Sequence, residues 1–230
     1  MSTRDQVFTS IRRALGVTGA EEPRRKAVED RLRDHPRGVI PRRGQVSPAE
    51  RVALFTSKVE AVAGTAQRIA STDDLPGAVA DYLRAHNLPL VVKRGADPTL
   101  AAAPWDREPA LTISVGATGG GDLIPLSHAF GAAAETGTLV LLSGSDNPTT
   151  LNFLPDNHIV VIAAETIDGD YEAVLGRLRD QVGAERLPRA INLVTGPSRS
   201  ADIEQTLILG AHGPRRLHVI VVEAGLPALN

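Results

Sequence analysis

Residues 158–194, HIVVIAAETIDGDYEAVLGRLRDQVGAERLPRAINLV, decide the fold class. The segment opens with a short apolar run rich in branched side chains, His158–Ala163, and closes with a similar run, Ala190–Val194. Between them, Tyr171–Val182 places its apolar residues on one face of a helix. Short strands that are apolar on both faces and alternate with helices are typical of a mainly parallel sheet covered on both sides. The sequence therefore predicts an α/β protein.

Further elements of the same kinds flank this segment. Ser47, Pro48 and Glu50 form the pattern of a capped helix start, and the helix is expected to run to about Ala63. Residues 73–86 have helical spacing as well. Short apolar runs predict further strands at 65–70, 89–93, 111–115, 138–142 and 217–222. We therefore expect residues 47–230 to form one α/β domain.

Residues 1–46 differ in composition from that domain. Apolar side chains at helical spacing predict a small amphipathic helix over Arg4–Leu15. Residues 19–46 are dense in Arg, Glu and Pro, which is typical of a solvated connector, with one short helix expected around Ala27–Arg33. Two interpretations stay open: the connector is simply solvated, or the helix and connector dock on a partner or a second protomer.

Composition excludes several classes of function. The 230 residues are 42% apolar and 23% charged, and 25 basic against 27 acidic residues give a net charge of −2, which argues against a strongly basic nucleic-acid binder. Aromatic residues make up only 3%, too few for a platform that stacks single-stranded bases. The chain has no cysteine, so it offers no thiolate for zinc or an iron–sulfur cluster, and any electron transfer needs a partner's redox centre. No apolar run has the length of a signal peptide or a membrane span, so a cytoplasmic location is expected.

The stretch Gly196–Glu204, GPSRSADIE, is a candidate anion site. Ser198, Arg199 and Ser200 follow a strand and precede an expected helix. The N-terminus of a helix favours anions, the serine hydroxyls donate hydrogen bonds, and a guanidinium suits a carboxylate or phosphate. The alternative is an ordinary serine cap whose following acidic residues stabilise the helix.

The ETGT stretch lies between three alanines and the apolar strand at 138–142. In such apolar surroundings Glu135 could act as a base, a nucleophile or a hydrogen-bond anchor for a ligand. The residues that follow it are expected to line the same site: Thr136, Gly137 and Thr138. The alternative is a structural ion pair between Glu135 and an arginine from the last part of the chain: Arg199, Arg215 or Arg216.

Other sequence motifs give weaker signals. His212 and Arg215, in the turn before the strand at 217–222, are candidate anion ligands, although a turn histidine is more often only solvated. The run Gly119–Gly121 allows a backbone to approach a ligand closely, but the dinucleotide and P-loop patterns are absent. The HExxH pattern of metalloproteases is absent too, so no metal site is expected. The GxSxG pattern of serine hydrolases is also absent.

Four motifs taken together resemble one family. AETGTLVLLSG, LPDNHIVVI, INLVTGPSRSADIE and LGAHGPRRLHVIVVE look like the lactate utilization protein C family of LUD-domain proteins, over roughly residues 47–224. The resemblance implies a three-layer α/β/α domain with a mainly parallel sheet, similar to the NagB, ribose-5-phosphate isomerase and CoA-transferase folds. It also implies a role in oxidising L-lactate to pyruvate beside partner proteins, at least one of which carries iron–sulfur clusters. The stretch between the glycine run and Thr138 is longer than the family pattern and carries Asp122 and His128.

Three functional hypotheses follow. The leading one is a non-redox component of a lactate-oxidising system that works with iron–sulfur oxidoreductase subunits, binds no cofactor of its own and holds a small carboxylate or another anion. The second is a stand-alone isomerase, acyl-transfer or ligase-type enzyme, with Glu135 as base or nucleophile. The third is a structural or regulatory binding module.

Overall fold

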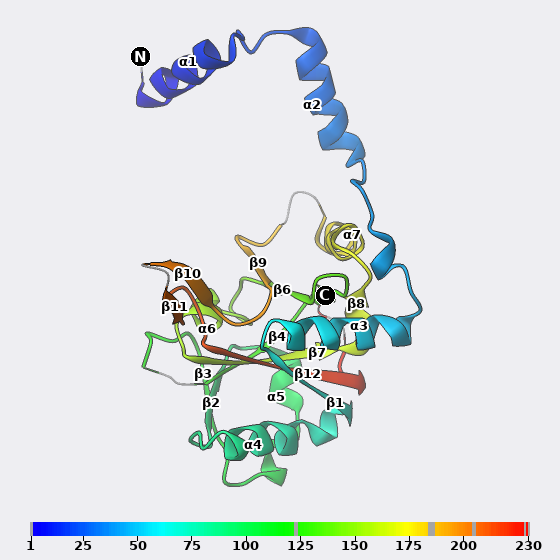
Figure 1. The fold of residues 1–230 in the computed structure, drawn as a ribbon, viewed down its shortest axis with the longest axis vertical. Coiled ribbons are helices and arrows are strands. Elements are labelled where there is room, and N and C mark those ends of the chain that lie inside the picture. The colour runs from blue at the N-terminus through cyan, green and yellow to red at the C-terminus, as the bar shows by residue number, and fades with distance from the viewer. Residues whose placement is uncertain (1, 122–123, 184–186, 204–205, 228, 230) are drawn as a thin grey trace. The chain divides into compact units, whose positions relative to one another are not determined.

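The computed structural model describes residues 2–121, 124–183, 187–203, 206–227 and 229, and the side chains of 200–209 are not described. The chain divides into two compact units, Met1–Ile40 and Pro41–Asn230 (Figure 1).

The first unit, Met1–Ile40, contains two helices, α1 (Thr3–Leu15) and α2 (Glu22–Asp34). The amphipathic pattern predicted α1, and a capping box between Ser2 and Asp5 marks its start. The second helix is longer than the short helix expected at 27–33, since it also includes the charged residues on either side of that range. Neither helix contains a buried residue.

The second unit is built on a six-stranded parallel sheet, which confirms the predicted α/β fold class. The strands lie in the order β1-β12-β7-β4-β2-β3. Their bounds are Thr65–Ser71 (β1), Arg216–Ala224 (β12), Asn157–Ala163 (β7), Pro125–His128 (β4), Val91–Arg94 (β2) and Thr112–Val115 (β3). β4 was not expected, because PLSH is short and contains no apolar run.

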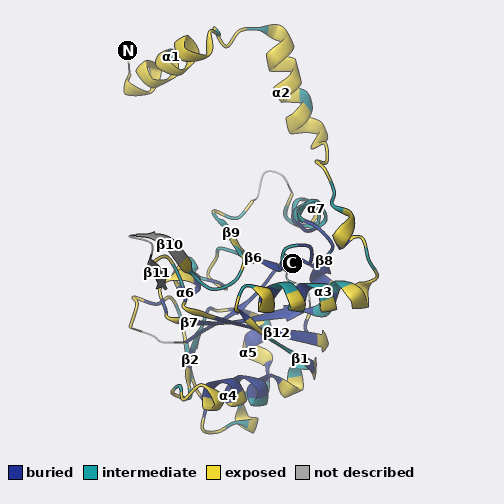
Figure 2. Cartoon of the chain, in the orientation of Figure 1, coloured by how far each residue is buried: buried dark blue, intermediate teal, exposed yellow. Residues whose placement is uncertain are grey.

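Helices cover both faces of this sheet. On one face lie α4 (Leu75–Ala85) and α5 (Pro98–Ala102), whose side chains join a core cluster with residues of β7 and β12. On the other face lies α3 (Pro48–Ala61), which begins at the predicted capping box of Ser47 and Glu50. Figure 2 shows the buried residues concentrated in the strands between these layers.

A second, four-stranded sheet packs on the α3 side. Its order is β8 (Ile167–Asp168), β5 (Gly131–Ala133), β6 (Thr138–Leu142) and β9 (Ile191–Val194). The strands expected at 138–142 and 190–194 therefore lie outside the main sheet and pair antiparallel with each other. Leu139 and Leu141 of β6 pack toward α3, whereas Val140 packs against α7 (Tyr171–Val182). A strand buried on both faces shows the same continuous apolar run as a strand of a parallel sheet, which is why its sequence did not reveal the second sheet.

Shorter elements complete the described part of the unit. The helix α6 (Thr149–Phe153) lies between β6 and β7. The strands β10 (Arg199–Ile203) and β11 (Thr206–Leu209) form a separate antiparallel hairpin. Single 3-10 turns lie at Arg42–Gly44, Thr72–Asp74, Trp105–Arg107 and Ala164–Thr166.

Candidate functional site

The ETGT stretch, Glu135–Thr138, forms the connection between β5 and β6, and we call it the ETGT turn. Gly137 has a φ of 72°, a left-handed conformation that favours glycine. A Cβ at this position would lie 2.7 Å from the Cβ of Lys58 and 3.0 Å from the backbone nitrogen of Val59. The turn therefore lies directly against α3, and this close approach fixes the positions of Glu135 and the two threonines.

Glu135 is a buried carboxylate at the start of this turn, 5% exposed. Its backbone N–H donates to the carbonyl of Gly169 at 3.1 Å. Its Oε2 is buried and accepts no hydrogen bond from the described residues, and Nη2 of Arg43 lies 3.4 Å away. The Arg43 side chain is 59% exposed, so water screens much of this ion pair. Oε2 is therefore an unused hydrogen-bond acceptor.

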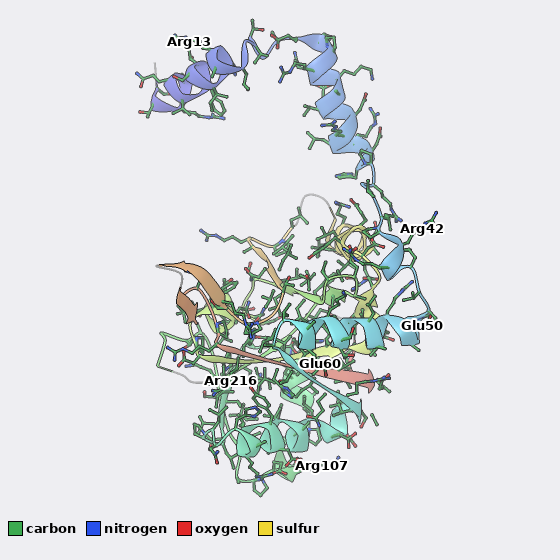
Figure 3. The ribbon with its side chains drawn as sticks, in the orientation of Figure 1. Arg13, Arg42, Glu50, Glu60, Arg107 and Arg216 are labelled. Atoms are coloured by element: carbon green, nitrogen blue, oxygen red, sulfur yellow. The ribbon has the colours of Figure 1, made fainter. Side chains whose placement is uncertain are left out.

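The ion pair of Glu135 differs from the expected alternative. Arg43 supplies the guanidinium, whereas Arg215 lies with its Nε 3.3 Å from a carboxylate oxygen of Asp156. Arg216 donates to Oδ1 of Asn157 at 3.2 Å. In Figure 3 the second unit carries Arg216 on one side and Arg42, the sequence neighbour of Arg43, on another. The sequence hid the pairing because residues 41–46 were assigned to the connector.

Four hydroxyl groups meet beside the ETGT turn, and we call them the hydroxyl cluster. Thr138 Oγ1 lies 2.7 Å from each of three oxygens: Thr136 Oγ1, Tyr171 Oη and Thr195 Oγ1. Thr136 also donates to Tyr171 at 3.1 Å. Thr195 is exposed, so the cluster extends from the buried turn to the surface. The ETGT pattern indicated the two threonines of the turn, but no local pattern indicated Tyr171, the first residue of α7, or Thr195, which follows β9.

The expected helix after Gly196-Pro197 is wrong. Arg199–Ile203 is strand β10, paired with β11. The physical reason can be read in the alternation of polar Ser200 and Asp202 with apolar Ala201 and Ile203, a period of two that favours a strand. Without a helix here, the helix dipole gives no reason for an anion to bind at Ser198.

The remaining predicted residues surround a turn at the start of β12. Ser198 donates its backbone N–H to the carbonyl of Pro214 at 2.8 Å, and its Oγ accepts from the backbone N–H of His212 at 3.2 Å. His212, Arg199 and Arg215 are exposed. The side chain of Ser200 lies outside the described residues, as does Asp122. Within the described residues, no hydrogen bond or ion pair joins this group to the ETGT turn.

Three buried polar side chains form a row of hydrogen bonds in the core. His158 Nε2 lies 3.0 Å from Ser127 Oγ, which donates to Oδ1 of Asn152 at 3.2 Å. Burial lowers the pKa of His158 to about 3, so its ring is neutral at pH 7. His158 is fully enclosed, so this chain of hydrogen bonds serves packing and not ligand binding.

The described part of the chain contains neither a membrane-spanning helix nor a cluster of metal ligands. No helix there is long and apolar enough to cross a bilayer. No group of three or more His, Asp or Glu side chains there is arranged to hold a metal ion.

Comparisons with known proteins match the central and C-terminal part of the chain. Residues 123–222 match the model of the LUD domain family. Lactate utilization protein C of Geobacillus sp. (strain WCH70) is 43% identical over 90 residues, which cover 39% of this chain and 37% of that protein. Lactate utilization protein C of Halalkalibacterium halodurans is 42% identical over 101 residues, 44% of each chain. The matched segment thus spans about two fifths of the length of these curated relatives.

One solved structure is similar over a longer stretch. The crystal structure of a DUF162 family protein from Deinococcus radiodurans has a TM-score of 0.59 and 24% sequence identity. The similarity covers 77% of this chain and 99% of that one. At this identity the likeness shows a shared fold alone.

Proposed function

We propose that the protein functions in lactate utilization, as a component without a redox centre of its own, because residues 123–222 match the model of the LUD domain family. The observation that carries the proposal is the identity of about 40% with proteins named lactate utilization protein C. The resemblance of the four sequence motifs supports it independently of the fold.

The electrons released by lactate oxidation need an acceptor, which supports a role for partner proteins. Oxidation of L-lactate to pyruvate releases a pair of electrons and a pair of protons, and an acceptor must take them. The chain has no cysteine, so its own side chains supply no thiolate for an iron–sulfur cluster. In the proposed system the electrons therefore pass to oxidoreductase subunits that carry iron–sulfur clusters.

The residues predicted from the sequence have roles within this proposal. Glu135 serves as the hydrogen-bond acceptor for a donor group of a ligand, because its Oε2 is buried and unused. Ser198 and the exposed side chains of Arg199, His212 and Arg215 are a candidate anion-binding surface, supported by the guanidinium of Arg199 and not by a helix terminus.

Growth on L-lactate as the carbon source tests the proposal. Cells that lack this chain should fail to grow on L-lactate, should grow on pyruvate, and should recover when the chain is restored. In extracts, lactate-dependent dye reduction should require both the chain and its iron-containing partners. Unchanged growth on L-lactate would contradict the proposal, and turnover of a substrate by the purified chain alone would favour the stand-alone enzyme.

Site variants refine the same experiment. Glu135→Gln and Arg199→Ala should reduce lactate-dependent growth while leaving the fold intact. Glu223→Gln is the matched control, because Glu223 is also paired with an arginine, Arg68, at 2.6 Å but lies on the surface at the end of β12. Equal growth of all three strains would remove the proposed roles of Glu135 and Arg199.

A further inference from the structure

The order of strands in the main sheet places a topological switch point between β2 and β4. These two strands are neighbours, yet the chain leaves their carboxyl ends in opposite directions. From β2 it continues through α5 to β3 at the sheet edge, and from β4 it continues through the second sheet to β7 (Figure 1). In open α/β sheets, ligands bind at such a topological switch point, outside the carboxyl ends of the strands.

An aspartate and a histidine meet at this point. His128 is the last residue of β4, and Asp97 lies three residues after β2. Both side chains are buried, and His128 Nδ1 lies 3.1 Å from Asp97 Oδ2. The other oxygen of Asp97 accepts the backbone N–H of Leu100 at 2.7 Å. Each residue is therefore held in one orientation by the other and by the start of α5.

The protonation of this pair follows from its contacts. Burial raises the pKa of Asp97, but the hydrogen bonds from His128 and from the N–H of Leu100 outweigh it, so the pKa lies below its usual range. An ionised Asp97 can only accept a hydrogen bond, so Nδ1 of His128 carries the proton. When the ring is neutral, Nε2 presents a lone pair, and Nε2 has no hydrogen-bond partner among the described residues.

A guanidinium stands beside the pair on the same face of the sheet. Arg94, the last residue of β2, pairs in register with Leu126, two residues before His128, so the side chains of Arg94 and His128 share a face. Nη1 of Arg94 donates to the carbonyl of Gly95 at 2.9 Å. Its Nε is buried without a partner, and Arg94 makes no ion pair within the described residues. Arg94 thus places a guanidinium that has no ion pair among the described residues on the same face as an oriented imidazole.

The glycine loop that follows β3 borders this position. Gly116 donates its N–H to the carbonyl of Arg94 at 2.9 Å, which ties the loop to the end of β2. A Cβ at Gly116, Gly119 or Gly120 would meet no atom within 4 Å. Among the described residues, open space therefore lies next to Gly116, at the end of β2, where a small ligand can approach.

We propose that Arg94, Asp97 and His128, the switch-point cluster, form a binding site for a small 2-hydroxycarboxylate, a class that rests on the proposed function in lactate utilization. The guanidinium of Arg94 binds the carboxylate through parallel hydrogen bonds. Nε2 of His128 accepts the hydrogen bond of the 2-hydroxyl group, and Asp97 positions the ring. The site lies at the ends of β2 and β4 and is thus separate from the ETGT turn between β5 and β6.

Calorimetric titration of the full-length chain with L-lactate tests the site. We expect binding of L-lactate, at least about tenfold weaker binding of propionate, which lacks the hydroxyl, and no binding of lactamide, which lacks the carboxylate. Arg94→Gln should abolish binding, and Arg94→Lys should weaken it because the fork is lost. His128→Gln should weaken L-lactate binding and leave propionate binding unchanged, a change in selectivity that misfolding would not produce.

Controls and contrary outcomes keep the test decisive. Arg68→Gln, which removes an arginine from another strand of the same sheet, should bind L-lactate as the unaltered chain does. Trp105 fluorescence confirms that each variant is folded. Equal affinity for L-lactate and propionate, loss of binding in Arg199→Ala but not in Arg94→Gln, or no binding of L-lactate at tens of millimolar would overturn the site. A chain that binds no lactate yet remains necessary for growth on lactate would leave the proposed function standing.

Discussion

Acidification should destabilise this protein through two buried histidines, His158 and His218. Burial lowers the pKa of His158 to about 3. Burial, and then the charge of His86, lowers the pKa of His218 to about 4. Both rings would have an ordinary pKa of 6.5 in the unfolded chain. Below pH 6.5 the unfolded state therefore binds protons that the folded state does not, and the free energy of unfolding falls with pH.

The size of the effect follows from these values. Between pH 7 and pH 5 each histidine in the unfolded chain becomes almost fully protonated, while each folded ring stays almost fully neutral. Each therefore removes about 2 kcal/mol from the free energy of unfolding, and the two together remove about 4 kcal/mol. This is a large part of the 5–15 kcal/mol that is usual for a folded domain.

Urea denaturation at a series of pH values measures this loss. The single tryptophan, Trp105, donates its ring N–H to the carbonyl of Leu100 at 2.7 Å and reports unfolding of the second unit. Near pH 5.5 the free energy of unfolding should fall by about 2.4 kcal/mol per pH unit, because each of the two unfolded rings is about nine-tenths protonated there. His158→Gln should halve that slope, whatever its stability at pH 7.

One result would refute the reasoning. If His158→Gln and the unaltered protein show the same slope, His158 is protonated in the folded state and is not held neutral by burial. His35→Gln, which replaces an exposed histidine of the first unit, serves as the control and should leave the slope unchanged.

Further predictions concern glycine and hydroxyl positions. Gly137→Ala should destabilise the protein by at least about 2 kcal/mol in urea denaturation, because the new Cβ meets the α3 backbone and φ is positive. Gly176→Ala, where a Cβ inside α7 meets nothing within 4 Å, should instead stabilise it by about 0.5–1 kcal/mol, and destabilisation there would contradict the packing. Tyr171→Phe should cost about 1 kcal/mol because the hydroxyl cluster loses a member. Tyr82→Phe, which removes a hydroxyl without a hydrogen bond in the described residues, should change the midpoint little, and equal effects of both variants would show that the cluster adds no stability.

Local sequence patterns predicted most elements of this fold. The capping box at Ser47 and the helical period of 171–182 placed α3 and α7 correctly, because both signals act between residues a few positions apart. Sheet membership depends on distant pairing and left no local mark. Strand β6 is buried on both faces by two different layers, and its sequence is the same kind of run that a parallel strand shows.

The candidate site was predictable only in part for the same reason. The ETGT turn stood out because a glutamate among alanines is unusual in a core, and the structure buries it. Its partner Arg43 was hidden in an arginine-rich stretch where no single arginine is distinguished. The pairing of Asp97 with His128 spans 31 residues and joins the ends of two strands, one of which, β4, is too short to be predicted from the sequence. Only the topology brings these side chains together.

The position of β12 in the main sheet has a consequence for synthesis of the chain. β1 pairs with β12 through contacts such as Thr65 with His218, which are 153 residues apart, and with no other described strand. At ordinary rates of translation β1 waits about 8–30 s on the ribosome before its partner has been made. During that time β1 and one edge of β7 present open backbone hydrogen-bonding groups, the surface on which strands of neighbouring chains add. The hydrogen bonds of β12 with β1 and β7 thus form last. A nascent chain that stops before Arg216 would be prone to aggregate and would bind chaperones.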